Sequence, residues 1–392
     1  MGFGIERRAR SRKGKGLFRR GPDPKQVGER LGWLLRRMDR RAKVRTGTKD
    51  DRFVAEVRYH DAAPVAKLAV GADAELTVRA DTSVLGPGYH ADILARLAPI
   101  LDELEYAWTE TEADPVAGTE AWLVETLRGD GRVRIGVPEQ RAFLCDAPIL
   151  TLLGPRDEAW RAAVLADPQR GRDAFPWWHA GKGRAELASA LVAMWLEVPW
   201  REPIDSEERD LMKQVDADLT AAHEADPALE LPYADWHALV CLLDMGPTRE
   251  NAIKQLANGR TPTIGYRRYS IDVALSGGWS LHVPGSFVGS WDEDNTRYWS
   301  TDGDRTFEFT SLTADGEDDS ARLLAVAPPA HPIVEERSDG NVRARVEMHD
   351  EAGVKVVIGL VADAPHVAIL TCKDAIGDAA WALAAWRSLR RT

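Results

Sequence analysis

The run IGYRRYSIDVALSGGWSLHVPGSF at residues 264–287 decides how the second half of this chain folds. Two runs with the alternation of β-strands flank the pair Gly277-Gly278, which suits a hairpin turn because glycine accepts positive φ angles. A third run, RTFEFTSLT at residues 305–313, follows an acidic, Trp-rich loop. Together the three runs predict the nucleus of an antiparallel sheet, around which the chain after residue 262 can be placed.

Beyond residue 262 the apolar period changes from about 3.6 residues to 2, as expected when helices give way to strands. Apolar and charged side chains alternate over residues 342–349, between turn-forming triplets at residues 339–341 and 351–353. An amphipathic helix then closes the chain at about residues 375–390. We expect an antiparallel-sheet domain over residues 261–392, closed by this C-terminal helix.

In the N-terminal part of the chain, some apolar residues repeat with the period of strands and others with the period of helices. Strand-like runs lie at residues 53–59 and 68–80, and a helix with a clear apolar face follows at residues 93–104. Helical patterns then dominate residues 160–258. We therefore expect an α+β fold, in which a mixed α/β domain with a helical subdomain at residues 47–260 precedes the antiparallel-sheet domain.

The order of elements after residue 262 resembles the Mog1/PsbP-like fold, which small bacterial proteins of the DcrB type share. The resemblance rests on GGWSLHVPGSF at residues 277–287, RTFEFTS at 305–311, the meander that follows, and a closing helix that ends in WRSLRR at 386–391. Proteins of this family serve as binding partners, lipoproteins or secretion-system chaperones, and they share no catalytic residues. The resemblance, which covers roughly a third of the chain, implies a binding role and transfers no site residue.

Charge is unevenly distributed along the chain. Residues 1–50 hold 17 Lys and Arg against 5 Asp and Glu, whereas the rest of the chain has a net charge of −23. Residues 1–46 therefore predict a basic arm, disordered at first and then an amphipathic helix, which docks on the acidic body or binds nucleic acid or an anionic membrane. The candidate contacts of this arm are Arg19, Arg20, Arg36, Arg37, Arg40 and Arg41.

Cysteine usage and hydropathy bear on the cellular compartment. Three cysteines far apart in sequence argue against a disulfide framework and suit a reducing cytosol. No apolar run reaches the roughly 18 residues of a membrane-spanning helix, and the basic N-terminus lacks the apolar core of a secretory signal. We expect a cytoplasmic protein without a transmembrane segment.

The loop DTSVLGPGYH at residues 81–90 lies between a predicted strand and a predicted helix. Its glycines allow a tight turn, and the start of a helix offers free N–H groups to an anion or a small polar ligand. The alternative is a structural turn in front of a capped helix, because the glycine spacing matches no nucleotide-binding fingerprint. The candidate ligand-binding residues are Ser83, Gly86, Gly88, Tyr89 and His90.

Fourteen tryptophans are many for a chain of this length, and several cluster near predicted loops and the closing helix. Tryptophan is favoured at the centres of protein interfaces, but it is equally a core residue. The candidate partner-binding residues are Trp177, Trp178, Trp291, Trp299 and Trp381.

Side chains with catalytic or metal-binding chemistry are scattered. His237 and Cys241 lie one turn apart on a predicted helix, but no further ligands follow at useful spacing for zinc. Cys145 beside Asp146 has the chemistry of a nucleophile, although a lone cysteine next to an apolar run is more often packed. We expect no metal and no cofactor.

The function that these observations favour is non-enzymatic. We expect a cytosolic protein-binding protein of the chaperone, immunity or adaptor type that uses Trp-rich loops. Two alternatives stay open: a nucleic-acid-associated factor that uses the basic arm, and an enzyme or small-ligand binder centred on residues 86–90.

Overall fold

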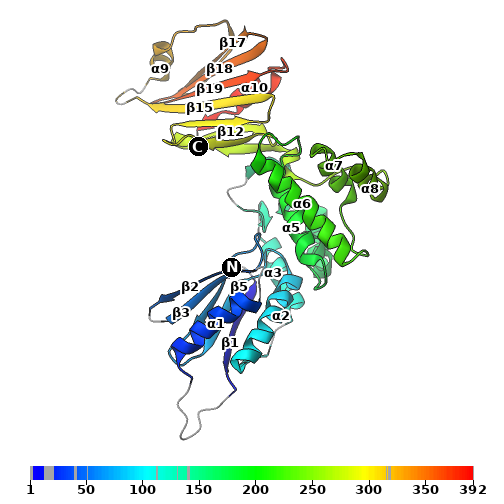
Figure 1. Ribbon diagram of the computed structural model, residues 1–392. Coiled ribbons are helices and arrows are strands. Elements are labelled where there is room, and N and C mark those ends of the chain that lie inside the picture. Colours follow the sequence, from blue (N-terminus) through cyan, green and yellow to red (C-terminus); the bar gives the residue numbers. More distant parts are fainter. Residues whose placement is uncertain are drawn as a thin grey trace.

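The protein has an α+β fold, described by a computed structural model (Figure 1). The structure describes residues 3–12, 22–38, 42–50, 52–111, 114–129, 131–138, 142–314, 316 and 319–391. One sheet lies at each end of the molecule, and a group of helices lies between them. Among the described residues no helix combines the length and the apolar composition needed to cross a bilayer.

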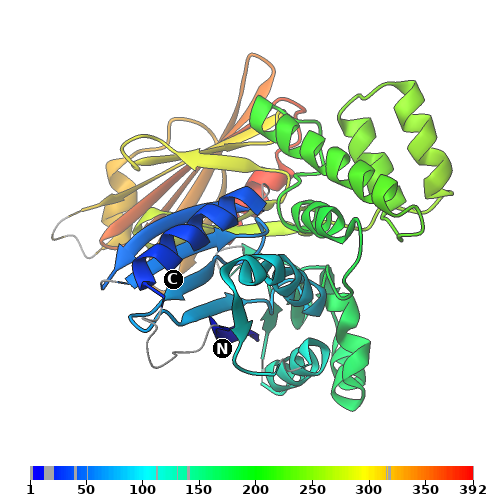
Figure 2. The same cartoon turned by 60° about the horizontal axis from the view of Figure 1, so that its bottom comes forward.

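The N-terminal sheet has six antiparallel strands in the order β2-β3-β4-β5-β1-β6. They are β1 (Gly4–Ser11), β2 (Lys43–Lys49), β3 (Arg52–Arg58), β4 (Ala66–Val70), β5 (Leu76–Asp81) and β6 (Tyr106–Trp108). The helices α1 (Pro24–Met38) and α2 (Pro87–Leu104) pack on one face of this sheet, and Figures 1 and 2 show that the other face carries no helix.

The prediction of a disordered start is wrong for Gly4–Ser11, which pair with β5 and β6 inside the sheet. Ile5 and Ala9 point to the core, where they are 3% and 0% exposed, while Glu6 and Arg8 face solvent. The run is therefore a half-buried strand whose outward positions are charged. Residues 13–21, the other part of the predicted disordered stretch, lie outside the described residues.

The predicted amphipathic helix of the basic arm exists as α1, but it ends at Met38, well before residue 46, where the predicted arm ends. Its buried side lies against β3, where an added Cβ at Gly28 would come within 2.5 Å of Phe53. Glycine at this position lets the helix backbone approach the sheet closely. The last residues of the predicted arm, from Lys43 on, belong to the edge strand β2.

The middle of the chain forms a small three-stranded sheet and a group of helices. The strands are β7 (Val133–Ile135), β9 (Ile149–Thr151) and β10 (Gly154–Arg156), in the order β10-β9-β7. The helices are α3 (Pro115–Leu127), α4 (Glu158–Ala166), the 3-10 helix η1 (Pro168–Ala174), α5 (Arg184–Leu196), α6 (Ser206–Ala225), α7 (Tyr233–Leu242) and α8 (Pro247–Ala257).

The C-terminal part consists of two sheets rather than the single sheet predicted from its first runs. A four-stranded sheet, β20-β12-β11-β8, contains β8 (Ala142–Phe143), β11 (Ser270–Ala274), β12 (Trp279–Pro284) and β20 (Arg390–Arg391). A seven-stranded antiparallel sheet runs in the order β13-β14-β15-β19-β18-β17-β16. Its strands are β13 (Val288–Trp291), β14 (Arg297–Thr301), β15 (Arg305–Thr313), β16 (Ile333–Asp339), β17 (Val342–Glu351), β18 (Val354–Asp363) and β19 (His366–Asp374).

The acidic, Trp-rich loop predicted after residue 287 is a hairpin, because β13 pairs with β14 and only residues 292–296 form the turn. The pair Gly277-Gly278 does make the predicted turn, with φ angles of 71° and 76° that favour glycine. The closing helix α10 (Ala380–Ser388) exists and packs between the two C-terminal sheets. A short helix, α9 (Ser320–Val326), lies on the opposite face of the large sheet.

The chain forms two large hydrophobic cores, and the change from one to the other falls near the predicted boundary. A strand from the first part nevertheless pairs within a sheet of the second. Ile264 and Tyr266 belong to the N-terminal core, and the C-terminal core begins with Leu275. Strand β8 comes from residues 142–143 but pairs with β11 in a C-terminal sheet. The first body therefore contributes an edge strand to the second.

Trp386 is the anchor of the closing helix, and replacing it should destabilise the C-terminal part. It is fully buried, and an added Cβ at Gly359 would lie 2.2 Å from its ring. We expect Trp386→Ala to lower the free energy of unfolding by about 3–5 kcal/mol in urea denaturation, because a large cavity remains. Trp299→Ala, at a side chain that is 44% exposed, is the control. An equal loss in both variants would contradict this assignment.

Candidate functional site

The two segments singled out from the N-terminal part, residues 81–90 and the aromatic run at 175–179, pack against each other. The N–H of Gly88 donates to the carbonyl oxygen of Trp177 at 3.0 Å, and the N–H of Trp177 donates to the carbonyl oxygen of Leu85 at 3.0 Å. The helix start that was expected to receive a ligand therefore already has a protein partner.

Close contacts leave no open space beside the two glycines of this loop. An added Cβ would lie 2.9 Å from Phe175 at Gly86, and 2.5 Å from the indole of Trp177 at Gly88. Gly86 also has a φ of 107°, a conformation that glycine adopts readily. The glycines serve a close approach of two protein segments, which is the structural alternative named above for this loop.

The other candidates in the loop are also turned inward. Tyr89 is 1% exposed and lies near Trp177, with ring centroids 5.6 Å apart. Ser83 is 5% exposed and donates its hydroxyl hydrogen to Asp81 at 2.6 Å. The expected ligand-binding arrangement on the surface is not what the structure shows, because these side chains complete the core.

His90 is buried and engaged by its neighbours. Its Nδ1 lies 3.2 Å from the hydroxyl of Thr82, and its ring stacks on Phe3 with centroids 5.5 Å apart. Burial, reinforced by the nearby positive charge of Arg7, lowers the pKa of His90 to about 4. The imidazole is therefore neutral at physiological pH and acts as a packed core residue.

The lowered pKa predicts a pH dependence of stability. In the unfolded chain His90 takes up a proton as the pH falls below its ordinary value of 6.5, whereas in the folded protein it stays neutral down to about 4. The stabilisation from a neutral His90 is thus complete above pH 6.5 and is lost as the pH falls towards 4. We expect His90→Asn to flatten the urea-unfolding free energy across this window. The matched control is His179→Asn, at an exposed position; a similar flattening there would argue against this role.

Four of the five candidate tryptophans pack inside the protein. Trp177 is 2% exposed, so its assignment to a partner-binding surface is wrong. Trp178 is half-buried and packs on Phe175, with ring centroids 5.5 Å apart. Trp291 and Trp381 are half-buried against the C-terminal core.

Trp299 is the candidate tryptophan with a large exposed area, at 44%. It lies on β14 and points away from the C-terminal core, since its neighbour Tyr298 packs on that core. Strand alternation places it on the outer face of the seven-stranded sheet.

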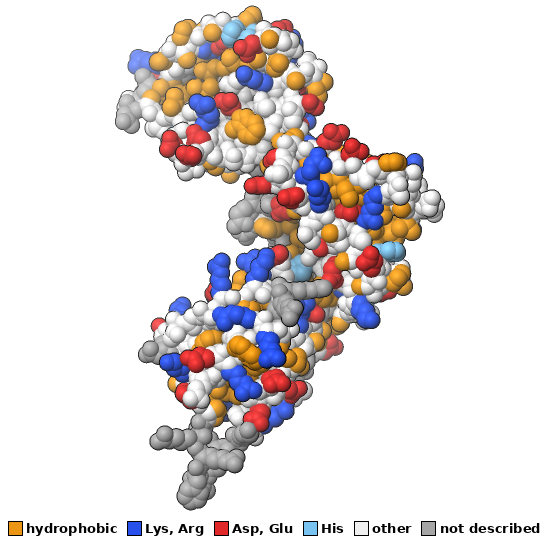
Figure 3. Space-filling model, in the orientation of Figure 1, with side chains coloured by type: hydrophobic (Ala, Val, Ile, Leu, Met, Phe, Trp, Pro, Cys, Tyr) orange, Lys and Arg blue, Asp and Glu red, His pale blue; other side chains and the backbone are white. Residues whose placement is uncertain are grey.

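The outer face of this sheet carries apolar side chains on its central strands, where solvated sheets usually carry polar ones. We call the part that no helix covers the apolar strip. It consists of Trp299, Leu312, Ile358, Val367 and Ile369, of which Trp299 and Leu312 (56%) are exposed and the others half-buried. Figure 3 shows hydrophobic side chains gathered on the upper lobe, which holds this sheet.

A buried ion pair fixes the cover over the rest of the outer face. Arg345 donates to Glu347 at 3.0 Å and to the carbonyl oxygens of Leu324 and Ala327 at the end of α9. Glu347 also accepts from the backbone N–H of His331 at 3.0 Å. The helix is thereby held over β17 and β18, and the apolar strip beside it stays uncovered.

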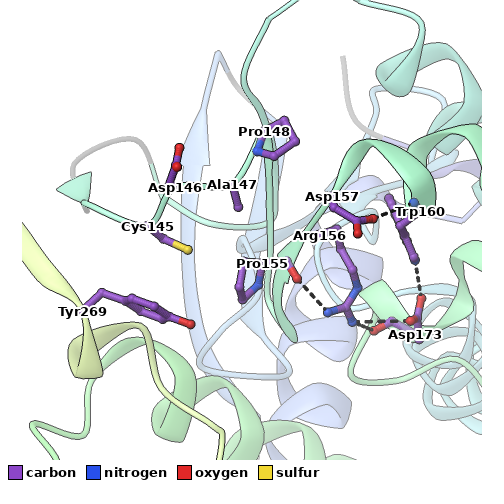
Figure 4. Close-up of a pocket in the computed structure, with 10 residues that line it drawn as sticks. All are labelled: Cys145, Asp146, Ala147, Pro148, Pro155, Arg156, Asp157, Trp160, Asp173 and Tyr269. Atoms are coloured by element: carbon purple, nitrogen blue, oxygen red, sulfur yellow. Dashed lines mark hydrogen bonds and ion pairs between the residues drawn. The ribbon is translucent and has the colours of Figure 1, made fainter.

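A pocket of about 640 Å³ lies between the small three-stranded sheet and the start of the C-terminal part (Figure 4). On one side Arg156 and Trp160 both donate to Asp173, the guanidinium to its backbone carbonyl oxygen at 2.8 Å and the indole N–H to its carboxylate at 3.0 Å. On the other side Cys145 and Tyr269 border the opening. Arg156 and Asp173 are thus engaged with each other on this side, and Asp157 accepts from the backbone N–H of Trp160 at 2.8 Å.

Burial raises the pKa of the Cys145 thiol, so the thiol stays protonated at neutral pH. Its assignment as a packed residue rather than a nucleophile fits its 8% exposure. Cys372 is fully buried with a raised pKa, whereas Cys241 is exposed.

Thiol reactivity tests this arrangement. We expect iodoacetamide to modify Cys241 first, and Cys145 and Cys372 only once urea unfolds the protein, as followed by peptide mass spectrometry. Rapid modification of Cys145 in the folded protein would show an activated thiolate instead.

A serine and a histidine that the sequence did not single out meet at a second pocket of about 580 Å³. The hydroxyl of Ser189 lies 2.8 Å from Nε2 of His60. However, Nδ1 of His60 accepts from the N–H of Ala62 at 3.2 Å, which assigns the proton to Nε2. His60 then donates to Ser189 rather than accepting its proton, the reverse of what activation of a nucleophile requires. Nothing in the spacing of two residues so far apart in sequence signals this contact.

The remaining candidates stay isolated. Nε2 of His237 and the sulfur of Cys241 lie 3.6 Å apart, but no three His, Cys, Asp or Glu gather into a metal site within the described parts of the chain. Arg36 donates to Thr46 on β2, and Arg37 lies over the ring of Trp33 at 4.7 Å. Arg19, Arg20, Arg40 and Arg41 lie outside the described residues.

Comparisons with known proteins add no functional assignment. The sequence matches no family model and no curated protein. A crystal structure from Bacteroides thetaiotaomicron aligns with a TM-score of 0.25 at 12% identity, over 31% of this chain and 48% of that chain. Similarity at this level carries no argument about fold or function.

Proposed function

We propose that this protein is a non-enzymatic binding protein that recognises another polypeptide through the apolar strip on the outer face of its C-terminal sheet. The observation that carries the proposal is the exposed Leu312 on β15, which lies opposite the half-buried Val367 on β19 with Ile369 further along the same face. Trp299 adds an exposed indole on β14, on the same face of the sheet, where it lies opposite Glu308. Apolar and aromatic side chains in such a patch are typical of protein contacts.

The chemistry of the candidate polar groups also favours binding over catalysis. His90 is a neutral core residue, Cys145 keeps its proton, and His60 donates to Ser189. Groups that are engaged in this way supply neither a base nor a nucleophile.

The resemblance of the C-terminal third to Mog1/PsbP-like proteins points in the same direction, because members of that family bind partners or act as chaperones. We propose an adaptor, chaperone or immunity role in the cytosol. The three free cysteines suit a reducing compartment.

A photo-crosslinker tests this function. With p-benzoylphenylalanine in place of Trp299, we expect irradiation of the native host to join this chain to a discrete polypeptide. Leu256, 44% exposed on α8, is the matched control position and should give no such product. The identified partner is then purified, and Ile369→Asp should weaken its binding at least about tenfold in calorimetry, as removal of an interface anchor does.

Two outcomes would contradict the proposal. One is equal crosslinking from residues 299 and 256, which indicates non-specific collision. The other is a partner whose affinity is unchanged in Ile369→Asp, provided that circular dichroism shows the variant to be folded.

A further inference from the structure

The open face of the six-stranded N-terminal sheet is strongly basic. On β2, β3, β4, β5 and β1 the side chains that point away from α1 and α2 are mostly Lys and Arg. These nine basic residues, which we call the basic face, are Arg8, Arg10, Lys43, Arg45, Lys49, Arg52, Arg58, Lys67 and Arg79. All nine are exposed, whereas the acidic side chains among the outward positions of these strands are Glu6, Glu56 and the half-buried Asp81.

Like charges lie directly opposite each other across the strands of the basic face. Lys43 pairs with Arg58, Lys49 with Arg52, and Lys67 with Arg79. Directly opposed like charges destabilise a sheet, so stability alone does not account for this pattern.

Part of this charge is neutralised within the protein. Lys43 pairs with Asp61 at 2.8 Å, Arg79 with Glu6 at 2.8 Å, and Arg10 with Glu75 at 2.5 Å. These pairs lie at the margins of the face and are exposed, apart from Glu75, and such pairs contribute little to stability.

The central part of the charge is only partly balanced, because Glu56 is the one acidic side chain opposite Arg45 and Lys67, and Arg58 shares Asp61 with Lys43. Five cations of the basic face form no ion pair within the part of the chain that the structure describes. They are Arg45, Lys49, Arg52, Arg58 and Lys67, all on the three adjacent strands β2, β3 and β4. An anionic ligand would satisfy this cluster.

From this charge complementarity we propose that the basic face binds the phosphate backbone of a nucleic-acid duplex without reading its sequence. A duplex carries one negative charge per about 1.7 Å of its axis, a density that matches adjacent rows of cations. Interfaces with nucleic acid are also more polar and more positively charged than interfaces between proteins.

The composition of the basic face argues for a duplex over the other polyanions. Its apolar side chains are the small, half-buried Val54 and Ala69, so it offers neither the aromatic anchors of a protein interface nor apolar groups that would enter a bilayer. Among the described residues no aromatic side chain lies on this face, which removes the stacking that single strands use.

The position of the basic face leaves it accessible. In Figure 2 α1 and α2 lie in front of the sheet and the C-terminal part lies behind it, so the open face looks towards the C-terminal part. Figure 3 shows a notch between the two lobes on that side. The apolar strip lies on the other body, so the two surfaces can be tested separately.

Fluorescence anisotropy with a labelled DNA duplex in a salt series tests the proposal. We expect Arg45→Gln, Lys49→Gln, Arg52→Gln and Arg58→Gln, combined in one full-length variant, to weaken binding by at least about tenfold at low salt. The slope of log K against log salt should fall by about 1 for each cation that contacts a phosphate. The matched control removes four exposed cations elsewhere, Arg128, Arg170, Lys254 and Arg322, each replaced by Gln; it should bind like the unmodified chain.

A third variant separates the face from the rest of the basic arm. It replaces Arg19, Arg20, Arg40 and Arg41 by Gln, and it should keep most of the duplex affinity. Loss of binding in this variant alone, or equal loss in the matched control, would overturn the proposal.

Competing polyanions give the remaining outcomes. We expect the same DNA as a single strand, polyglutamate, and phosphatidylserine vesicles all to bind more weakly than the duplex. Tighter binding of any of the three, or no duplex binding at low salt, would overturn the proposal. Circular dichroism checks that the Gln variants are folded, and removal of opposed like charges should leave their stability unchanged or higher.

Discussion

One buried phenol fixes the segment of chain that leads out of the N-terminal core into the C-terminal sheets. The hydroxyl of Tyr266 accepts from the N–H of Thr151 at 3.0 Å and donates to the carbonyl oxygen of the same residue at 2.8 Å. Its ring stacks on Phe143 and packs against Trp195, with centroids 4.8 and 5.2 Å away. Both backbone groups of Thr151 are buried, so they need this partner. The start of β11, four residues after Tyr266, takes its position from this contact.

The protein fills its internal spaces with its own side chains and leaves two sheet faces open. Trp177 occupies the space beside Gly88, and Arg156 donates to the backbone of Asp173 in the pocket of Figure 4. The uncovered faces differ in character, since the basic face presents charge and the apolar strip presents Trp299, Leu312 and half-buried aliphatic side chains. This contrast favours two binding events with unlike partners rather than one reaction centre.

The amount of structure that could be predicted from the sequence depended on whether apolar periodicity was visible. The closing helix and the alternation at residues 342–349 were predicted because their apolar positions repeat regularly. Gly4–Ser11 was missed because only Ile5 and Ala9 mark its buried side among several arginines. The basic face was not predicted because its cations come partly from the presumed arm and partly from the predicted strands at 53–59 and 68–80, and no local pattern shows that these strands pair in one sheet. The burial of Trp177 depends on a contact between segments far apart in the chain, which no local pattern reveals.

The pairing of β8 with β11 affects how this protein can be divided. If the chain were cut at the apparent boundary near residue 260, the C-terminal fragment would lack β8, the strand at residues 142–143. The backbone of β11 would then be exposed along the edge that β8 covers. Unprotected strands of this kind recruit other chains and promote aggregation. The two bodies are therefore not independent modules, and their evolutionary exchange or recombinant separation would require a new way to shield that edge.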